Sequence, residues 1–299
     1  RTLAPSGGGA AAPADEPAAG GDEPAKDEGD EAEAGAEEPA DPMLDPERWR
    51  DAIEFTIEPV VARLSNDRDP MPSPDGLHLM FRGIRGNLHV KDLATGEIDT
   101  LLEHWDRGID ATWSPCGRYV AWSVNDLDFN ADVWIHEMGS DEPPVNVTRH
   151  PDNDLRPSFS ADGRLMAFVS ERVGEEYDVW VVALDESIEA LRGPDRDAYW
   201  DEARKAARAR KPLEPMTIAD RAAKAAEAAE GGDEGDHAED RPFTRDDLES
   251  AYLRLRRLTR LEGSESQAMI IPSGERIVFS ASGLAAGLHS VEWDGSNRQ

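Results

Sequence analysis

The side chains that could act as nucleophiles in this sequence are one cysteine, Cys116, and a set of serines that recur in similar segments. Nucleophilic catalysis needs such a group beside a general base and an oxyanion-binding site. The sequence contains no Gly-x-Ser-x-Gly motif. Cys116 stands where two of the equivalent segments have aspartate, and Ser73, Ser114 and Ser160 repeat at one position. We therefore interpret all four as turn residues.

Histidines and acids are the side chains that could bind a metal ion. No two of the seven histidines have the His-x-x-x-His spacing of a zinc site, and His89, His136 and His289 recur at comparable positions, which favours a structural role. A calcium loop would take its ligands from Asp126, Asp128, Asn130 and Glu137. Ala131 replaces the glycine that such a loop needs, so a polar hairpin loop is expected instead. The sequence predicts no catalytic, metal-binding or cofactor-binding residue and no cofactor.

The chain has 299 residues, with 63 acidic and 32 basic side chains and a net charge of −31. This charge argues against nucleic acid or an anionic membrane as the main partner, because like charges repel. No apolar run is long enough to span a membrane. A single cysteine excludes an internal disulfide and a cysteine-rich zinc site.

Residues 1–47 form an acidic segment rich in Ala, Pro and Gly. Residues 1–45 hold 13 acids against Arg1 and Lys26, and no Val, Ile, Leu, Phe, Trp or Tyr occurs between Ala4 and Pro42. Such a composition buries too little apolar surface to offset the entropy of ordering. We predict disorder for 1–47, with an acidic interaction tail as the alternative.

Four segments of the remaining chain share one pattern: residues 73–81, 114–122, 160–168 and 271–279. Each begins with Ser-Pro-Asp-Gly or a variant and continues into an apolar run. The glycines are Gly76, Gly117, Gly163 and Gly274, spaced by 41, 46 and 111 residues. The last spacing equals one period plus an insertion of about 65 residues.

The repeated pattern predicts tight turns that close β-hairpins, because Pro presets φ, Asp bonds its own backbone and Gly accepts a positive φ. The strands before the turns are expected at 111–113 and 157–159. Third strands are expected at 87–93, 132–137, 177–182 and 288–293, and fourth strands at 62–65, 145–149 and 257–260. Trp113, Trp122, Trp134 and Trp180 fall on these strands and are interpreted as core.

Units of four short antiparallel strands that repeat every 40–50 residues are typical of β-propeller blades. We therefore predict an all-β protein with about four blades of an incomplete ring, cut from a longer polypeptide. A β-sandwich is the alternative, but sandwich strands do not repeat one turn sequence at a fixed period. The expected organisation is blades over 48–185, an insertion over 186–250 and a further, truncated blade over 251–299.

The insertion is expected to contain two helices, 195–211 and 217–230, followed by disorder over 231–240. Thr217 and Asp220 have the spacing of a capping box. Large apolar residues are few, so the sequence predicts an exposed, weakly docked excursion, with a lid or docking arm as the alternative. Deleting 195–240 should then leave the blades folded.

The blades resemble the TolB-type, WD-like propeller repeat, whose Ser-Pro-Asp-Gly turn precedes a strand ending in Ala-Phe or Ala-Trp. Residues 50–299 as a whole resemble the propeller region of bacterial tricorn-type serine peptidases, in the C-terminal-processing peptidase family. The stretches that carry this second resemblance are residues 144–154, 206–213 and 247–259.

The resemblance implies a non-catalytic propeller segment that gates or holds peptide substrates for a peptidase domain elsewhere in the same polypeptide. The full-length protein would be a serine peptidase, located in the periplasm or cell envelope, with the cytoplasm as the alternative. A stand-alone TolB-type propeller that acts as a protein-binding scaffold in the cell envelope is the alternative function. A propeller with its own hydrolase activity is the weakest hypothesis, because no acid–base constellation emerges.

Overall fold

The structure is a computed structural model that describes residues 57–209, 216–231 and 241–299. The chain divides into two units, Arg1–Pro59 and Val60–Gln299. Residues 57–59, the described part of the first unit, form no helix or strand. The disorder predicted for 1–47 and for 231–240 lies outside the described residues, apart from Gly231, which ends a helix.

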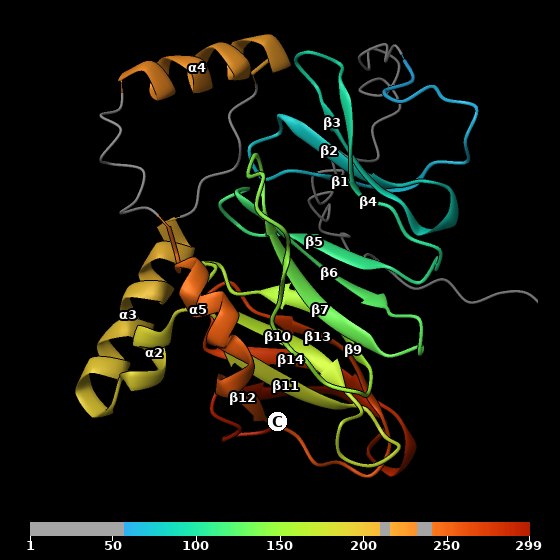
Figure 1. The fold of residues 1–299 in the computed structure, drawn as a ribbon. Helices are drawn as coiled ribbons and strands as arrows, with labels where there is room; N and C mark the ends of the chain where they lie inside the picture. Colours follow the sequence, from blue (N-terminus) through green and yellow to red (C-terminus); the bar gives the residue numbers. More distant parts are fainter. Residues whose placement is uncertain (1–56, 210–215, 232–240) are drawn as a thin grey trace, which may run out of the picture. The chain divides into compact units, whose positions relative to one another are not determined.

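The second unit contains four antiparallel sheets, which we number as blades 1 to 4 in chain order (Figure 1). Blade 1 holds β1 (Arg68–Pro72), β2 (His78–Arg82), β3 (Leu88–Asp92) and β4 (Ile98–Leu102). Blade 2 holds β5 (Asp110–Trp113), β6 (Tyr119–Asn125), β7 (Ala131–Glu137) and β8 (Val145–Asn146). Blade 3 holds β9 (Asp154–Phe159), β10 (Leu165–Ser170), β11 (Asp178–Ala183) and β12 (Leu255–Arg257), and blade 4 holds β13 (Glu265–Ile270), β14 (Arg276–Ala281) and β15 (Gly287–Glu292).

The predicted fourth strands are only partly confirmed. Residues 62–65 form no strand, and blade 1 instead uses β4, which was not predicted. The reason lies in the turn after β3, where the Asp92 carboxylate accepts hydrogen bonds from the N–H groups of Ala94 and Thr95 at 2.7 and 2.8 Å. This Asx turn reverses the chain at once and returns it beside β3.

The repeated serines close the hairpins between first and second strands, as predicted. In blade 3, Ser160 Oγ donates to the carboxylate of Asp162 at 2.5 Å and accepts from the N–H of Leu165 at 2.9 Å. Ser73 makes the same two bonds in blade 1. In blade 2, Cys116 replaces the aspartate, and its Sγ lies 3.3 Å from Ser114 Oγ. These serines are buried parts of the turn.

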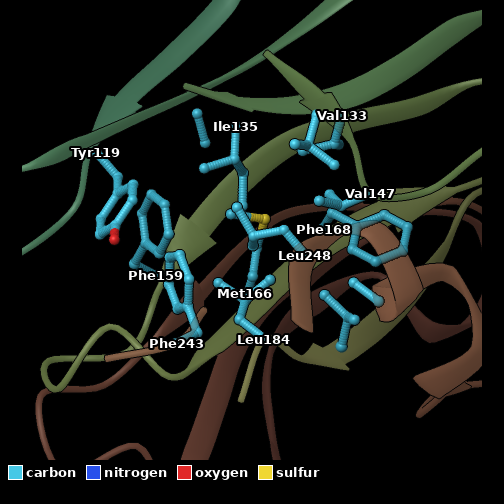
Figure 2. Packing of buried hydrophobic residues seen from close by; sticks show 14 residues of the cluster. Tyr119, Val133, Ile135, Val147, Phe159, Met166, Phe168, Leu184, Phe243 and Leu248 are labelled. Atoms are coloured by element: carbon cyan, nitrogen blue, oxygen red, sulfur yellow. The ribbon is translucent and has the colours of Figure 1, made fainter. Parts of the chain in front are cut away.

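Successive blades pack face to face through their middle strands. All six residues of β10 are buried, because Met166 and Phe168 face blade 2 while Leu165, Ala167 and Val169 face blade 4. Figure 2 shows the blade 2–blade 3 cluster, in which Ile135 of β7 and Phe168 of β10 contribute side chains. Burial on both faces explains why this strand is an uninterrupted apolar run rather than an alternating one.

The insertion joins the third and fourth strands of blade 3, because β12 pairs with β11. Within its described residues it holds the helices α2 (Glu186–Ala190), α3 (Gly193–Ala209), α4 (Ile218–Gly231) and α5 (Arg245–Ser250). A 3-10 turn at Ala251–Arg254 follows α5, and others lie in blade 1 at Ile84–Gly86 and in blade 4 at Gly283–Ala285. The two long helices were predicted to within two residues. The Thr217 hydroxyl accepts the N–H of Asp220 at 3.1 Å, as expected of a cap.

The prediction of weak docking is wrong for α3. Trp200 on this helix is 6 % exposed and packs against Trp293, with ring centroids 5.3 Å apart. A Cβ on Gly274, in the turn of blade 4, would lie 2.6 Å from the Trp200 ring, so the turn fits the indole only with glycine there. Tyr199 packs against the same cluster, so two neighbouring aromatic side chains anchor a helix that is otherwise rich in alanine.

A buried acid lies where blades 3 and 4 meet. Glu265, at the start of β13, is 1 % exposed and accepts a hydrogen bond from the Thr259 hydroxyl at 3.2 Å. Burial raises the pKa of Glu265 to about 7, and the nearby Asp178 carboxylate acts in the same direction. Asp178 is itself paired with Arg257 at 2.7 Å.

The Cys116→Asp variant should be more stable than the natural chain. The new carboxylate would accept the Ser114 hydroxyl, as Asp75 and Asp162 do in blades 1 and 3, and one such bond contributes about 0.5–1.5 kcal/mol. Urea unfolding followed by circular dichroism measures this difference. Cys116→Ala is the control, and equal stability of the two variants would contradict the assigned turn role.

The Trp200→Ala variant should lose about 3–5 kcal/mol of unfolding free energy, because it leaves a cavity beside Trp293. Lys205→Ala on the same helix removes only an exposed pair with Glu202 and should leave the unfolding free energy nearly unchanged. Thermal and urea unfolding provide the measurement. A loss in Trp200→Ala as small as in the control would show that α3 is not docked.

Glu265 should make the protein less stable as the pH rises. Its folded pKa lies above the ordinary value of 4.5, so the folded state holds the proton more tightly than the unfolded chain does. The unfolding free energy should therefore fall between pH 4.5 and about 7, by at most about 3 kcal/mol. Urea unfolding across this range compares the natural protein with the Glu265→Gln variant. The unfolding free energy of the natural protein should fall relative to that of the variant as the pH rises. A difference between the two that stays constant with pH would refute the assignment.

Candidate functional site

The first strands of all four blades line one pocket of about 320 Å³, which we call the first-strand pocket. Its walls come from β1, β5, β9 and β13, and Arg82 of β2 joins them. The residues with the main polar groups are Asp69, Arg82, Asp110, Arg156 and Gln267. Four segments that span most of the second unit's sequence thus contribute to one surface.

One equivalent residue from each blade defines this pocket. Asp69, Asp110, Arg156 and Gln267 are separated by 41, 46 and 111 residues, which are the spacings of the turn glycines. The positions two residues later, Met71, Thr112, Ser158 and Met269, line it as well. The repeat that builds the blades therefore also places these side chains together, while their chemistry differs from blade to blade.

The backbone is strained at three of these four positions. Asp69, Arg156 and Gln267 have φ values of 53°, 58° and 56°, in the left-handed region. The pairing of each strand with its neighbour shifts register beside these residues, as in a β-bulge. Asp110 pairs regularly with Ser123, so blade 2 lacks the bulge. Bulges turn a side chain out of the normal pleat, and such strain is concentrated at functional sites.

Two arginine–aspartate pairs differ in how firmly they are held. Arg82 lies 2.6 Å from the Asp69 carboxylate and donates a second bond, also 2.6 Å long, to the Ile109 carbonyl. Arg156 lies 3.9 Å from Asp110, and both side chains are nearly half exposed. Burial raises the pKa of Asp110, and Arg156 and Arg82 oppose that rise. The Arg156–Asp110 pair is therefore the one free to exchange its contacts with a ligand.

Neutral and apolar groups complete the pocket. Met269 is 64 % exposed, and the Gln267 amide offers both a donor and an acceptor. Thr112 and Ser158 are hydroxyl groups on the wall, but no histidine or cysteine is among the described lining residues. The arrangement can bind charged, amide and apolar groups together. It does not provide a nucleophile with an adjacent imidazole base.

The residues singled out from the sequence lie elsewhere. His89, on β3, contacts Thr100 Oγ1 at 2.9 Å, and burial lowers its pKa, as it does for His136 on β7. The acidic loop after Asn125 joins β6 to β7, and Asp126 Oδ1 accepts the N–H groups of Asp128 and Asn130. Among the described residues, no group of three or more His, Cys, Asp or Glu side chains is placed to hold a metal ion.

Sequence reasoning missed the first-strand pocket, although a signal for it was present. Extending the spacing of the turn glycines to the strand before each turn leads directly to Asp69, Asp110, Arg156 and Gln267. The turns share residue types and are visible in the sequence for that reason. The pocket positions differ in type, so only their common register links them.

Of the helices described, none is long and apolar enough to cross a membrane.

Comparisons with known proteins agree with the repeat. No family model matches the chain. A TolB homologue of Chlorobium chlorochromatii is 34 % identical over 120 residues, which cover 38 % of this chain and 26 % of that protein. The matched region thus spans about a quarter of the relative's length.

Solved structures are similar at low sequence identity. The crystal structure of the tricorn protease matches with a TM-score of 0.50 and 14 % identity, over 80 % of this chain and 22 % of that one. TolB from Acinetobacter baumannii gives a TM-score of 0.46 and 16 % identity, over 77 % of this chain and 41 % of the other. The four repeated sheets, the match to the Chlorobium protein and the tricorn structure together establish a TolB-like β-propeller fold.

Proposed function

We propose that this chain is a non-catalytic propeller segment that holds extended polypeptide at the first-strand pocket. In this proposal the pocket delivers the polypeptide to a serine peptidase domain elsewhere in the same, longer protein. The observation that carries the proposal is the convergence of four equivalent but chemically different residues on one surface. Among them, the Arg156–Asp110 pair is half exposed and only loosely joined.

The chemistry of the pocket suits a polypeptide. A peptide offers N–H donors, carbonyl acceptors, side chains of both charges and apolar groups. The pocket presents the complementary set in Asp110, Arg156, Gln267 and Met269. Strained bulges fix the backbone at two of these residues, Arg156 and Gln267, so binding requires less ordering of the chain at the site.

The link to a peptidase is supported by sequence and fold. Residues 144–154, 206–213 and 247–259 resemble segments of tricorn-type peptidases, and the tricorn protease structure shares the fold. Within 247–259, Arg254 is buried and donates to the Ala183 carbonyl at 2.8 Å. That bond ties the returning chain to the end of β11.

A second candidate function is a TolB-type scaffold that binds a folded protein partner in the cell envelope. The 34 % identity to the Chlorobium TolB homologue over 120 residues favours it. Both functions use the propeller as a binding surface, and under both we propose the periplasm or cell envelope as the location. They differ in the state of the partner, which is extended in the first case and folded in the second.

Binding of fluorescein-labelled β-casein, an unfolded polypeptide, tests the proposal by fluorescence anisotropy. The chain should bind casein without cleaving it. Arg156→Ala and Asp110→Asn should each weaken binding about tenfold, because each removes one charged group from a partly desolvated site. Arg164→Ala is the matched control, since Arg164 is about as exposed as Arg156 and pairs with Asp185 at 3.6 Å outside the pocket.

The outcomes separate the hypotheses. Casein affinity that is unchanged in Arg156→Ala and Asp110→Asn would reject the pocket as the binding site. Absence of casein binding, together with capture of a folded envelope protein that requires Arg156, would favour the scaffold function. Casein cleavage by this chain alone would contradict a non-catalytic role.

A further inference from the structure

A second pocket, of about 290 Å³, lies between the end of β4 in blade 1 and the strands of blade 2. We call it the side pocket. Its apolar wall is formed by Leu102, Trp122, Val124, Trp134 and Pro144. None of its lining residues belongs to the first-strand pocket. This volume is at the lower end of the range for ligand pockets. It suits one or two side chains of a partner better than a drug-sized molecule.

Three large apolar side chains stand exposed where the chain leaves this pocket. Trp105, Leu127 and Phe129 are 45 %, 84 % and 68 % exposed, and their neighbours in sequence line the pocket. The Trp105 and Phe129 rings meet edge to face, with centroids 5.4 Å apart. Grouped exposed aromatic residues beside an apolar hollow are typical of a protein interaction surface.

Phe129 is held outward at an energetic cost. Its φ is 65°, a conformation that a bulky side chain rarely adopts. The loop enforces it, since Asp126 Oδ1 accepts the N–H groups of Asp128 and Asn130 at 2.8 and 3.0 Å. A glycine would adopt this backbone without strain, so the fold itself does not require phenylalanine here. The residue type therefore points to a role for the ring in binding.

The charge around the side pocket is acidic. Asp126 and Asp132 are among its lining residues, Asp128 is exposed on the same loop, and no lysine or arginine is among the described lining residues. This charge repels nucleic acid, anionic lipid and the acidic residues 1–45 of this chain, whose net charge is −11. It attracts a cationic segment.

We propose that the side pocket binds a segment of a partner protein that presents one large apolar side chain flanked by lysine or arginine. The apolar side chain enters between Leu102, Val124 and Trp134, with Trp105 and Phe129 packing over it. The basic flanks face Asp126 and Asp128. This inference is independent of the function proposed for the first-strand pocket.

The probe that tests it is the peptide acetyl-Lys-Lys-Ser-Phe-Ser-Lys-Lys-amide, titrated into the full chain by calorimetry. Two matched peptides accompany it, one with glutamate for every lysine and one with alanine for phenylalanine. The lysine–phenylalanine peptide should bind at least tenfold more tightly than either. Its affinity should fall as salt is raised, because screening weakens the contacts with the acidic loop.

The deciding variant is Phe129→Gly. It should fold at least as stably as the natural chain, because it relieves the positive φ, and yet bind the peptide about tenfold more weakly. Trp105→Ala should weaken binding to a similar extent. Leu284→Ala is the control, since Leu284 is 85 % exposed and lies in blade 4. That control and Arg156→Ala should both bind the peptide normally.

Several results would overturn the proposal. They are equal binding of the glutamate peptide, unchanged affinity in Phe129→Gly, or no binding at millimolar peptide. Binding to phosphatidylcholine vesicles that is lost in Phe129→Gly would instead identify a membrane-contacting surface. Since Arg156 lies outside the side pocket, loss of casein binding in Arg156→Ala with normal peptide binding would separate the two sites.

Discussion

The structure depends on one constraint, which is that the middle strands of each blade must be covered on both faces. β10 is buried along its whole length because blades 2 and 4 pack on its two sides. β6 is likewise covered on both faces: Tyr119 and Ala121 face blade 3, and Val120 and Trp122 face blade 1. An isolated blade would expose both of these apolar faces to water, so the blades stabilise one another and fold together.

This packing determines where function can reside. Most side chains of the middle strands are buried in the core. Side chains that can reach a ligand therefore lie mainly on the first strands and in the loops. The first strands tolerate positive φ at Asp69, Arg156 and Gln267 because the paired middle strands hold their register on either side. Strain that would unfold an isolated hairpin is thereby retained in the folded blades, where it directs side chains into the first-strand pocket.

The first-strand pocket and the side pocket differ in charge. The chain carries a net charge of −31, yet the first-strand pocket balances Asp69 and Asp110 against Arg82 and Arg156. The side pocket is acidic, like the chain as a whole. A charge-balanced pocket can accept polypeptides of varied sequence, whereas an acidic apolar pocket selects for basic partners. The two proposals therefore concern different partners.

The sequence by itself determined the features that arise from short-range interactions. The Ser-x-Asp-Gly turns, most strands, the α3 and α4 helices and the turn role of Cys116 were all predicted, because hydrogen bonds and hydropathy within a few residues specify them. Tertiary structure alone decided the docking of Trp200 and the burial of Glu265, and it alone showed that residues sharing a register in the repeat meet in one pocket. These depend on residues tens of positions apart, such as Trp200 with Gly274 and Asp110 with Arg156. Their meeting follows from how the blades pack on one another, and no local pattern in the chain encodes that distance.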